Sequence, residues 1–257
     1  MKVPIAKIGK IQKIDIKKST GIKFYDNIAR ICTVVKKNSS YDDRRDKSPY
    51  RMAELFGGSW EDYNNHFIVQ AAGCPLKCNY CYVDNLKPDF LMTANELVDK
   101  FIDFKKKAEP RFKIKLKVFH FMGGAPAAYP SFWKELRKAL DKKGLEDVVL
   151  FSDVILLEDY FFKKKPWRYL NINHFIVTGC LKGTNKENFL KNTGFDLFEQ
   201  SMKELEKYLP IKNFYITLIE HEDKDLEDLY KIIPEQRIDY LKVINYEVTK
   251  KNQMCKK

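Results

Sequence analysis

The sequence predicts an α/β fold built on a parallel sheet, arranged as a partial barrel of six βα units. From His66 onward, apolar runs of strand length alternate with amphipathic helical patterns, which is typical of parallel strands joined by crossover helices. Six such units are too few to close an eight-stranded barrel. We therefore expect an open sheet whose ligands lie at the carboxyl ends of the strands.

Each predicted strand is a short run rich in Val, Ile, Leu and Phe. The first, "HFIVQAA", leads directly into a loop with three cysteines. The later runs are "IKLKVFHFM", "DVVLFS", "NINHFIVTG", "NFYITLIE" and "DYLKVINYEV". In chain order the six strands are expected at residues 66–72, 114–122, 147–152, 171–179, 213–220 and 239–248.

The helices between the strands are identified by their apolar spacing and their capping residues. Thr93 with Glu96, and Thr184 with Glu187, have the spacing of capping boxes. Ser131, after a proline, is the expected N-cap of the second helix. Helices are expected at residues 93–107, 130–140, 155–165, 184–209 with a break, and 225–233.

Residues 1–60 differ from the rest and predict an N-terminal extension of mixed strand and loop, ahead of a barrel domain at residues 61–257. Short apolar alternation in "IAKIGKIQKIDIKKSTGIKFY" and "IARICTVVKK" gives way to the polar "NSSYDDRRDKSPYR". Covering the barrel mouth and docking a partner are both open roles for this extension.

The composition is that of a folded protein, with 44% hydrophobic and 32% charged residues among 257. No apolar run approaches the roughly 20 residues of a membrane helix, and the first residues lack an apolar signal-peptide core. We expect a cytoplasmic protein. The net charge of +12 would suit RNA or an acidic protein surface. Much of the lysine, however, lies in runs such as "FKKKA" and "FKKKPW", where helix ends carry solvated charge.

Three of the six cysteines, Cys74, Cys78 and Cys81, fall within eight positions at the spacing Cys-x3-Cys-x2-Cys. In a cytoplasmic chain this clustering favours metal binding over disulfides. A structural zinc site would need a fourth ligand, such as Cys180 or a histidine, and the sequence has no second Cys-x2-Cys knuckle. Three thiolates instead suit an iron–sulfur cluster in which one iron lacks a protein ligand. Such an iron is open to a substrate or a cofactor.

The cysteine loop resembles the cluster loop of the radical S-adenosylmethionine (SAM) superfamily. The spacing comes with an aromatic residue, Tyr80, just before the last cysteine, and the loop follows the first strand of the barrel. The resemblance covers about residues 67–248. It implies that each of the three cysteines binds one iron of a single 4Fe-4S cluster, whose fourth iron chelates SAM. An electron passed through the cluster then cleaves SAM to methionine and a 5′-deoxyadenosyl radical, which takes a hydrogen from the substrate.

The resemblance also indicates candidate SAM contacts, Tyr80 among them. "FMGGAPAAYP" stands where the family usually carries Gly-Gly-Glu-Pro, so the backbone of Gly123 and Gly124 is expected against the methionine part of SAM. Ala125 replaces the glutamate, which removes a carboxylate contact to the ammonium group. Ser152 and Asp153 end the third strand, where relatives place polar residues near SAM, although both also suit a turn.

"GCLKGTNKENF" resembles the Asp-Leu-Lys-Gly stretch of glycyl-radical-enzyme activating proteins. The resemblance makes Lys182 a candidate contact to the carboxylate or ribose of SAM. The alternative is an ordinary surface lysine whose charge is solvated. Cys180 stands in the place of the aspartate. Three roles are open for it: a thiol that faces the substrate, a metal ligand, or an inert core residue. His221, after the fifth strand, is a further candidate contact, whereas His120 lies within a strand pattern typical of a core histidine.

The expected function is that of a radical SAM enzyme reduced by a donor such as ferredoxin or flavodoxin. The resemblance to activating enzymes favours a macromolecular substrate, through activation or modification of a partner protein. Modification of tRNA is the alternative within the same class. A second alternative is not an enzyme: a zinc- or cluster-binding module that recognises nucleic acid. A third is a degenerate family member that binds the cluster without effective chemistry, and Ala125 is the hint for it.

Overall fold

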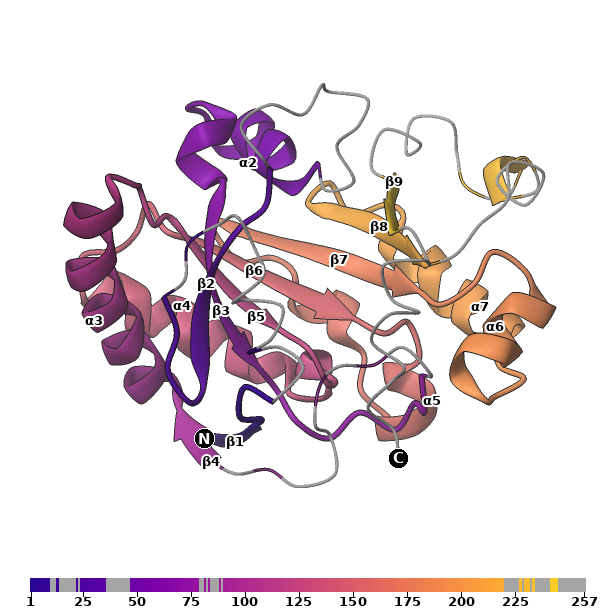
Figure 1. Cartoon of the computed structure of the whole chain (residues 1–257). Helices are drawn as coiled ribbons and strands as arrows, with labels where there is room; N and C mark the ends of the chain where they lie inside the picture. The colour runs from indigo at the N-terminus through magenta and orange to yellow at the C-terminus, as the bar shows by residue number, and fades with distance from the viewer. Residues whose placement is uncertain are drawn as a thin grey trace.

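The centre of the molecule is a seven-stranded sheet (Figure 1). The computed structural model describes residues 1–9, 13, 22, 24–35, 47–78, 81, 83, 88, 90–219, 227, 229–231, 233 and 241–244. The strands are β1 (Lys2–Ile5), β2 (Ala29–Thr33), β3 (Asn65–Gln70), β4 (Phe90–Thr93), β5 (Val118–Met122), β6 (Val149–Val154), β7 (Phe175–Leu181), β8 (Phe214–Ile219) and β9 (Leu241–Ile244). The α-helices are α2 (Ser48–Phe56), α3 (Ala94–Phe112), α4 (Pro130–Lys142), α5 (Glu158–Phe162), α6 (Lys186–Thr193) and α7 (Phe198–Tyr208). Short 3-10 helices are η1 (Trp60–Tyr63), η2 (Pro126–Ala128) and η3 (Pro166–Tyr169).

The strand order confirms the predicted parallel sheet and its open form. The sheet runs β2-β3-β5-β6-β7-β8-β9, and every neighbouring pair from β3 to β9 is parallel. β2 adds a seventh, antiparallel strand beside β3. In the described part of the chain the edge strands β2 and β9 do not pair with each other, so the barrel is partial.

The outer face of the sheet is buried under α3, α4 and α7. Phenylalanine rings of β3 and β5 pack on those of α3, with 5.4 Å between the ring centres of Phe67 and Phe101 and 5.7 Å between those of Phe101 and Phe119. Trp133 of α4 is fully buried against Phe175 of β7. This packing leaves the opposite, inner face of the sheet available for a site.

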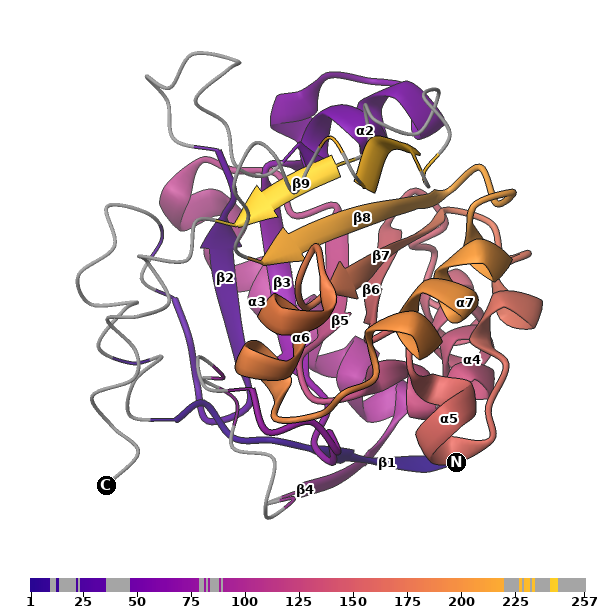
Figure 2. The same cartoon turned by 90° about the vertical axis from the view of Figure 1, so that its right-hand side faces the viewer.

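The inner face is closed at the amino ends of its strands by α2. Met52 of this helix is fully buried in a cluster with residues near the starts of the parallel strands. Those sheet and loop residues are Tyr63, Val118, Val149, Phe151, Ile176 and Tyr215. α2 therefore covers the inner face near the starts of these strands, and Figure 2 shows this helix above β8 and β9.

The first 60 residues are joined to the rest of the molecule by strand pairing. β1 pairs with β4, and the Ala6 amide donates to the Gln70 carbonyl oxygen at 2.9 Å. β2 lies in the main sheet. The N-terminal segment therefore flanks the start of the cysteine loop and extends the sheet, while the domain boundary at residue 60 stays a prediction.

The helix starts confirm one predicted cap and correct two others. Thr93 and Glu96 form the expected capping box of α3. Ser131 is not the N-cap of α4, because the helix begins at Pro130, whose fixed φ suits a first helical position. Asn185, rather than Thr184, caps α6, and its side-chain oxygen accepts from the Asn188 amide at 2.9 Å.

The strands also shift relative to the sequence pattern. β6 and β7 each extend two residues beyond their expected ends, so that the polar residues there lie within strands. The helix expected over 225–233 falls largely outside the described residues. Of the described helices, none combines the length and apolar character needed to cross a bilayer.

Candidate functional site

The loop after β3 is fixed at its root by the neighbouring strands. The Ala71 amide donates to the Met122 carbonyl oxygen at 2.8 Å, and the Ala72 amide donates to the Pro4 carbonyl oxygen at 3.0 Å. Gly73 follows with a φ of +91°, a left-handed conformation that glycine adopts without strain. The chain thus turns away from the sheet at its carboxyl edge, directly before the first cysteine.

The three predicted cluster cysteines pack with one apolar cluster of residues, and we call this group the cysteine pocket. Cys78 is buried, and Cys74 and Cys81 are partly exposed. The Cys81 amide donates to the Cys78 carbonyl oxygen at 3.0 Å, which fixes these two residues in one tight turn. All three pack with an apolar cluster formed by Leu76, Ala125, Ala128, Ile155, Leu157 and Phe189. The cluster joins the cysteine loop to the segments that follow β5, β6 and β7.

The electrostatic surroundings of Cys74 place the other two thiols and Lys182 within reach of it. Burial is the main cause that raises the pKa of Cys74 to about 12, and Cys78 and Cys81 raise it further. A hydrogen bond from the Leu76 backbone and the charge of Lys182 oppose the rise. A thiol with so high a pKa stays protonated at neutral pH unless a metal takes the place of the proton.

The chemistry of the three side chains fits an iron–sulfur cluster. Cysteine thiolates are the usual protein ligands of such clusters, with each cysteine on a different iron. Cys74, Cys78 and Cys81 are three such donors, and all three pack with one apolar cluster of residues.

The turn after β5 carries the predicted pair of glycines. Gly123 and Gly124 have φ of +69° and +49°. A Cβ on Gly123 would approach Gln70 to 3.1 Å and Val83 to 3.2 Å, so this backbone lies close to both the end of β3 and the cysteine loop. Ala125, the position of the family glutamate, is fully buried in the apolar cluster of Cys78.

Ser152 and Asp153 point to opposite faces of β6, since side chains alternate along a strand. Ser152 is fully buried on the outer side, where its hydroxyl donates to the Phe121 carbonyl oxygen at 2.7 Å and accepts from the Trp133 indole at 3.0 Å. Asp153 faces inward, and its carboxylate oxygen lies 3.1 Å from His120 Nε2. The structure therefore brings Asp153 to the inner face and keeps Ser152 away from it.

His120, which the sequence pattern assigned to the core, lies on the inner face beside Asp153. Its ring stacks on Phe151 with 3.9 Å between centres, and the ring of His66 meets it edge-on at 5.4 Å. Nδ1 of His120 is buried and finds no hydrogen-bond partner in the described part of the chain. With Asp153 accepting from Nε2, the neutral ring would present Nδ1 as an acceptor.

The end of β7 positions Lys182. The buried side chain of Asn192 donates to the Lys182 carbonyl oxygen at 2.7 Å. A Cβ on Gly183 would come within 2.5 Å of the Phe189 amide nitrogen, so only glycine lets α6 approach this closely. Cys180 pairs in register with Thr217 of β8, whose hydroxyl lies 2.6 Å from that of Thr178.

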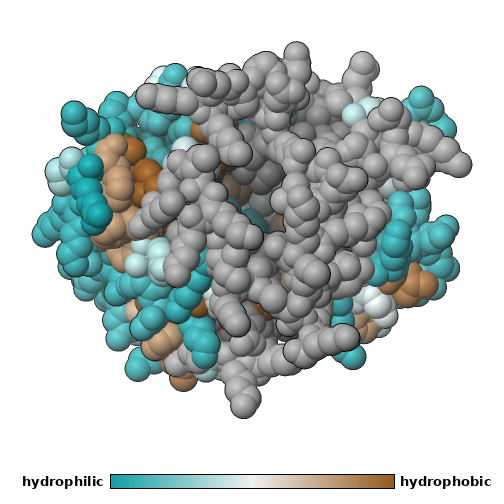
Figure 3. Space-filling view, in the orientation of Figure 1, coloured by the Kyte–Doolittle hydropathy of each residue, from teal (hydrophilic) through white to brown (hydrophobic). Residues whose placement is uncertain are grey.

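The inner face thus gathers polar side chains from neighbouring strands beside the cysteine pocket. In the space-filling view in the orientation of Figure 1, the described residues at the left and right of the molecule are mostly hydrophilic (Figure 3). Asp153 and Lys182 are the predicted side chains that the structure brings to this region. Tyr80 and His221 lie outside the described residues.

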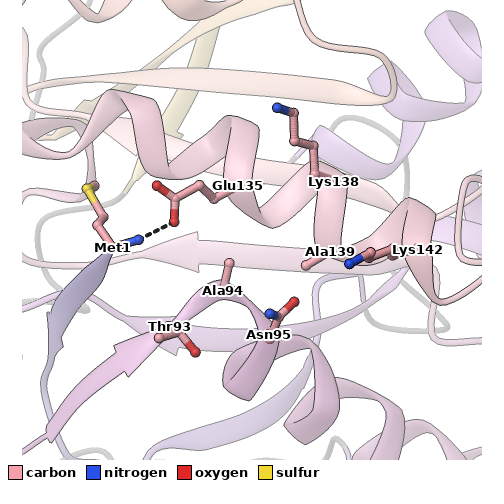
Figure 4. A pocket seen from close by; sticks show the side chains of 8 residues that line it. All are labelled: Met1, Thr93, Ala94, Asn95, Glu135, Lys138, Ala139 and Lys142. Carbon is pink, nitrogen blue, oxygen red and sulfur yellow. Dashed lines mark hydrogen bonds and ion pairs between the residues drawn. The ribbon is translucent and has the colours of Figure 1, made fainter.

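A separate open pocket of about 360 Å³ lies among the helices of the outer layer, between the start of α3 and α4 (Figure 4). The amino group of Met1 contacts the Glu135 carboxylate at 2.6 Å across its edge. Its remaining lining residues are Thr93, Ala94, Asn95, Lys138, Ala139 and Lys142. None of these belongs to the cysteine pocket.

Comparison with known proteins gives both a family and a fold. Residues 68–233, well over half of the chain, match the sequence model of the Radical SAM superfamily. No curated protein matches the chain in sequence. The crystal structure of Streptococcus suis SuiB bound to its precursor peptide SuiA matches with a TM-score of 0.55 and 15% identity, over 96% of this chain and 54% of SuiB.

SuiB bound to S-adenosylmethionine matches with a TM-score of 0.52 and 16% identity, over 70% of this chain and 40% of SuiB. At this identity the two structures share a fold, and the present chain spans only about half of the SuiB chain. The family match and the fold agree with the cysteine loop at the carboxyl edge of the sheet. The chain therefore belongs to the radical SAM superfamily, whose members use a 4Fe-4S cluster and SAM.

Proposed function

We propose that this chain is a radical SAM enzyme in which Cys74, Cys78 and Cys81 each hold one iron of a 4Fe-4S cluster. The observation that supports the proposal best is the shared apolar pocket of the three thiols, with Lys182 close by. When bound, the cluster would supply the electron that cleaves SAM and so generates the radical that takes hydrogen from a substrate.

The proposed SAM contacts come from the turns that follow β5 and β7. The backbone of Gly123 and Gly124 leaves room for close approach to the methionine part of SAM. The Lys182 ammonium would pair with the carboxylate of SAM. Tyr80 and His221 remain candidates, whereas Ser152 is set aside because its hydroxyl already makes two buried hydrogen bonds.

Asp153 is proposed to act together with His120 rather than as a separate SAM ligand. Its carboxylate holds the imidazole by Nε2 and leaves Nδ1 as a buried acceptor on the inner face. A polar atom of this kind would orient a hydroxyl or N–H group of whatever lies above the sheet. The surrounding apolar cluster would exclude water from the reacting centre.

We further propose a macromolecular substrate, with a peptide segment of a protein ahead of tRNA, and a cytoplasmic location. The Leu181 to Thr184 stretch, which resembles that of enzymes that activate partner proteins, supports the protein substrate. One structural neighbour, SuiB, was solved with its precursor peptide. The net charge of +12 favours an acidic partner or RNA. An RNA substrate would be identified by a binding affinity that falls steeply as the salt concentration rises.

The test is anaerobic reconstitution with iron and sulfide, followed by assay of 5′-deoxyadenosine formed from SAM and dithionite. We expect formation by the wild type and none above background by Cys78→Ala. Lys182→Met should raise the SAM concentration for half-maximal rate by about tenfold, as expected for one lost charge-assisted contact. Lys106→Met, on the exposed side of α3, is the matched control. About one zinc and no iron per chain would contradict the proposal and favour the zinc module.

A further inference from the structure

The wall of the cysteine pocket that reaches the molecular surface is formed by α5. Phe161 and Phe162 of this helix pack against the same apolar cluster as the three cysteines. Their neighbour Tyr160 is 46% exposed, and its ring lies 5.0 Å from that of Phe161. In Figure 1 the segment that follows β3 runs to α5. A short aromatic path therefore leads from solvent to the cysteine loop.

This wall carries an uncompensated positive surface. Lys163, Lys164, Lys165 and Arg168, which we call the basic rim, follow the last turn of α5 and are exposed. Among the described residues, no carboxylate forms an ion pair with any of the four. The Lys163 ammonium donates to the Tyr160 carbonyl oxygen at 3.2 Å and lies 5.9 Å from the centre of the Tyr160 ring.

By comparison, a nearby lysine outside the rim is paired with a carboxylate. On α6, Lys186 pairs with Asp196 at 3.1 Å. The acidic residues at α5 are Glu158 and Glu204, which are both buried, and the partly buried Asp159. Among the described residues, the basic rim is therefore a cationic surface that adjoins the aromatic wall of the pocket.

We propose that the basic rim and Tyr160 form the docking surface for an acidic electron-transfer protein of the flavodoxin type. The inference rests on the proposed function of the cysteines. Electron transfer slows steeply with distance, so a donor must dock near the cysteine loop, and α5 packs against the same apolar cluster as that loop. A cationic rim around an exposed aromatic residue attracts a negatively charged partner and raises its association rate, by 10-fold to about 1,000-fold at low ionic strength.

The test measures reduction of the reconstituted holoenzyme by a reduced, acidic flavodoxin in stopped flow, at low and at high salt. The variant is the triple charge reversal Lys163→Glu, Lys164→Glu and Lys165→Glu. The matched control reverses three exposed lysines on the helical outer layer, Lys106, Lys113 and Lys142, with the same change in net charge. Binding of oxidised flavodoxin to each protein gives a second readout that needs no turnover.

At low salt we expect the basic-rim variant to be reduced at least about tenfold more slowly and to bind flavodoxin correspondingly more weakly, with the difference shrinking at high salt. The control should stay within about twofold of the wild type. Excess dithionite should reduce all three proteins to the same extent. Equal effects of the two triple variants, or no effect, would overturn the docking site.

Two further outcomes are informative. Loss of tRNA binding by the basic-rim variant, with unchanged reduction by flavodoxin, would overturn the inference and assign the rim to RNA. A wild-type protein that forms no cluster, or whose cluster dithionite does not reduce, would contradict the proposed function itself, and the docking site would fall with it.

Discussion

Glu158, at the start of α5, makes the stability of the cysteine-pocket wall depend on pH. Its carboxylate is fully buried and accepts hydrogen bonds from the Ile155 and Leu157 amides at 2.7 and 3.2 Å. Burial is the main cause that raises its pKa from 4.5 to about 7, and the nearby Glu204 raises it further. In the unfolded chain the same carboxyl ionises at its ordinary value.

The sign of the effect follows from where the proton is held. Between the unfolded and the folded pKa, the folded state keeps a proton that the unfolded state has lost, so stability falls as pH rises. For a folded pKa of about 7, the loss contributed by Glu158 between about pH 5 and about pH 8 is about 2.5 kcal/mol. Glu158→Gln cannot ionise and should lack this contribution.

The assay is urea unfolding of the reduced apoprotein across that pH range. The free-energy difference between the wild type and Glu158→Gln should change by about 2.5 kcal/mol in favour of the Gln variant as pH rises. Glu206→Gln, at an exposed position of α7, should parallel the wild type at every pH. A difference between the wild type and Glu158→Gln that is the same at both ends of the range would refute the reasoning.

Three further substitutions test the site and its supports. Gly183→Ala places a Cβ within 2.5 Å of the α6 backbone, so the free energy of unfolding in urea should fall by about 1–3 kcal/mol. SAM binding measured by calorimetry should also weaken, and unchanged values of both would contradict the close approach. Trp133→Phe removes the indole hydrogen bond to Ser152 and should lower stability by about 1–2 kcal/mol, less so in a background that already carries Ser152→Ala. Asp153→Ala leaves the buried His120 ring without its partner and should cost about 1–3 kcal/mol, whereas Asp153→Asn, which keeps an acceptor oxygen, should cost less.

The alternation of strands and helices was predictable because each strand is a continuous apolar run and each helix has an amphipathic face. The capping box of Thr93 was predictable for a similar reason, since its partner Glu96 is only three residues away. The cysteine loop followed from the same logic of local spacing. These features depend on residues that lie only a few positions apart.

The N-cap residues were predicted less well where two adjacent residues are both suitable caps or helix starts. Thr184 and Asn185 are both good N-caps, and the structure uses Asn185 because its side chain reaches the amide three residues on. Ser131 follows a proline that itself opens the helix. Local propensity does not decide between adjacent candidates of similar strength.

The pairing of His120 with Asp153 was not predictable because it joins two strands through the register of the sheet. Strands that are buried on both faces read as uniformly apolar, so the sequence hides which side chains face inward. His120 pairs in register with Phe151, two positions before Asp153, which places both on the inner face. Burial of the sheet by α2 from the N-terminal segment was hidden for the same reason, since it joins residues far apart in the chain.

The most direct test of the account is the electron paramagnetic resonance spectrum of the reduced, reconstituted protein, recorded before and after addition of SAM. A cluster held by Cys74, Cys78 and Cys81 leaves one iron open, so SAM should change the spectrum of the wild type. The three single Cys→Ala variants should give no such signal. A spectrum that SAM leaves unaltered, or an unchanged signal in Cys78→Ala, would contradict the assignment of these three cysteines to an open cluster.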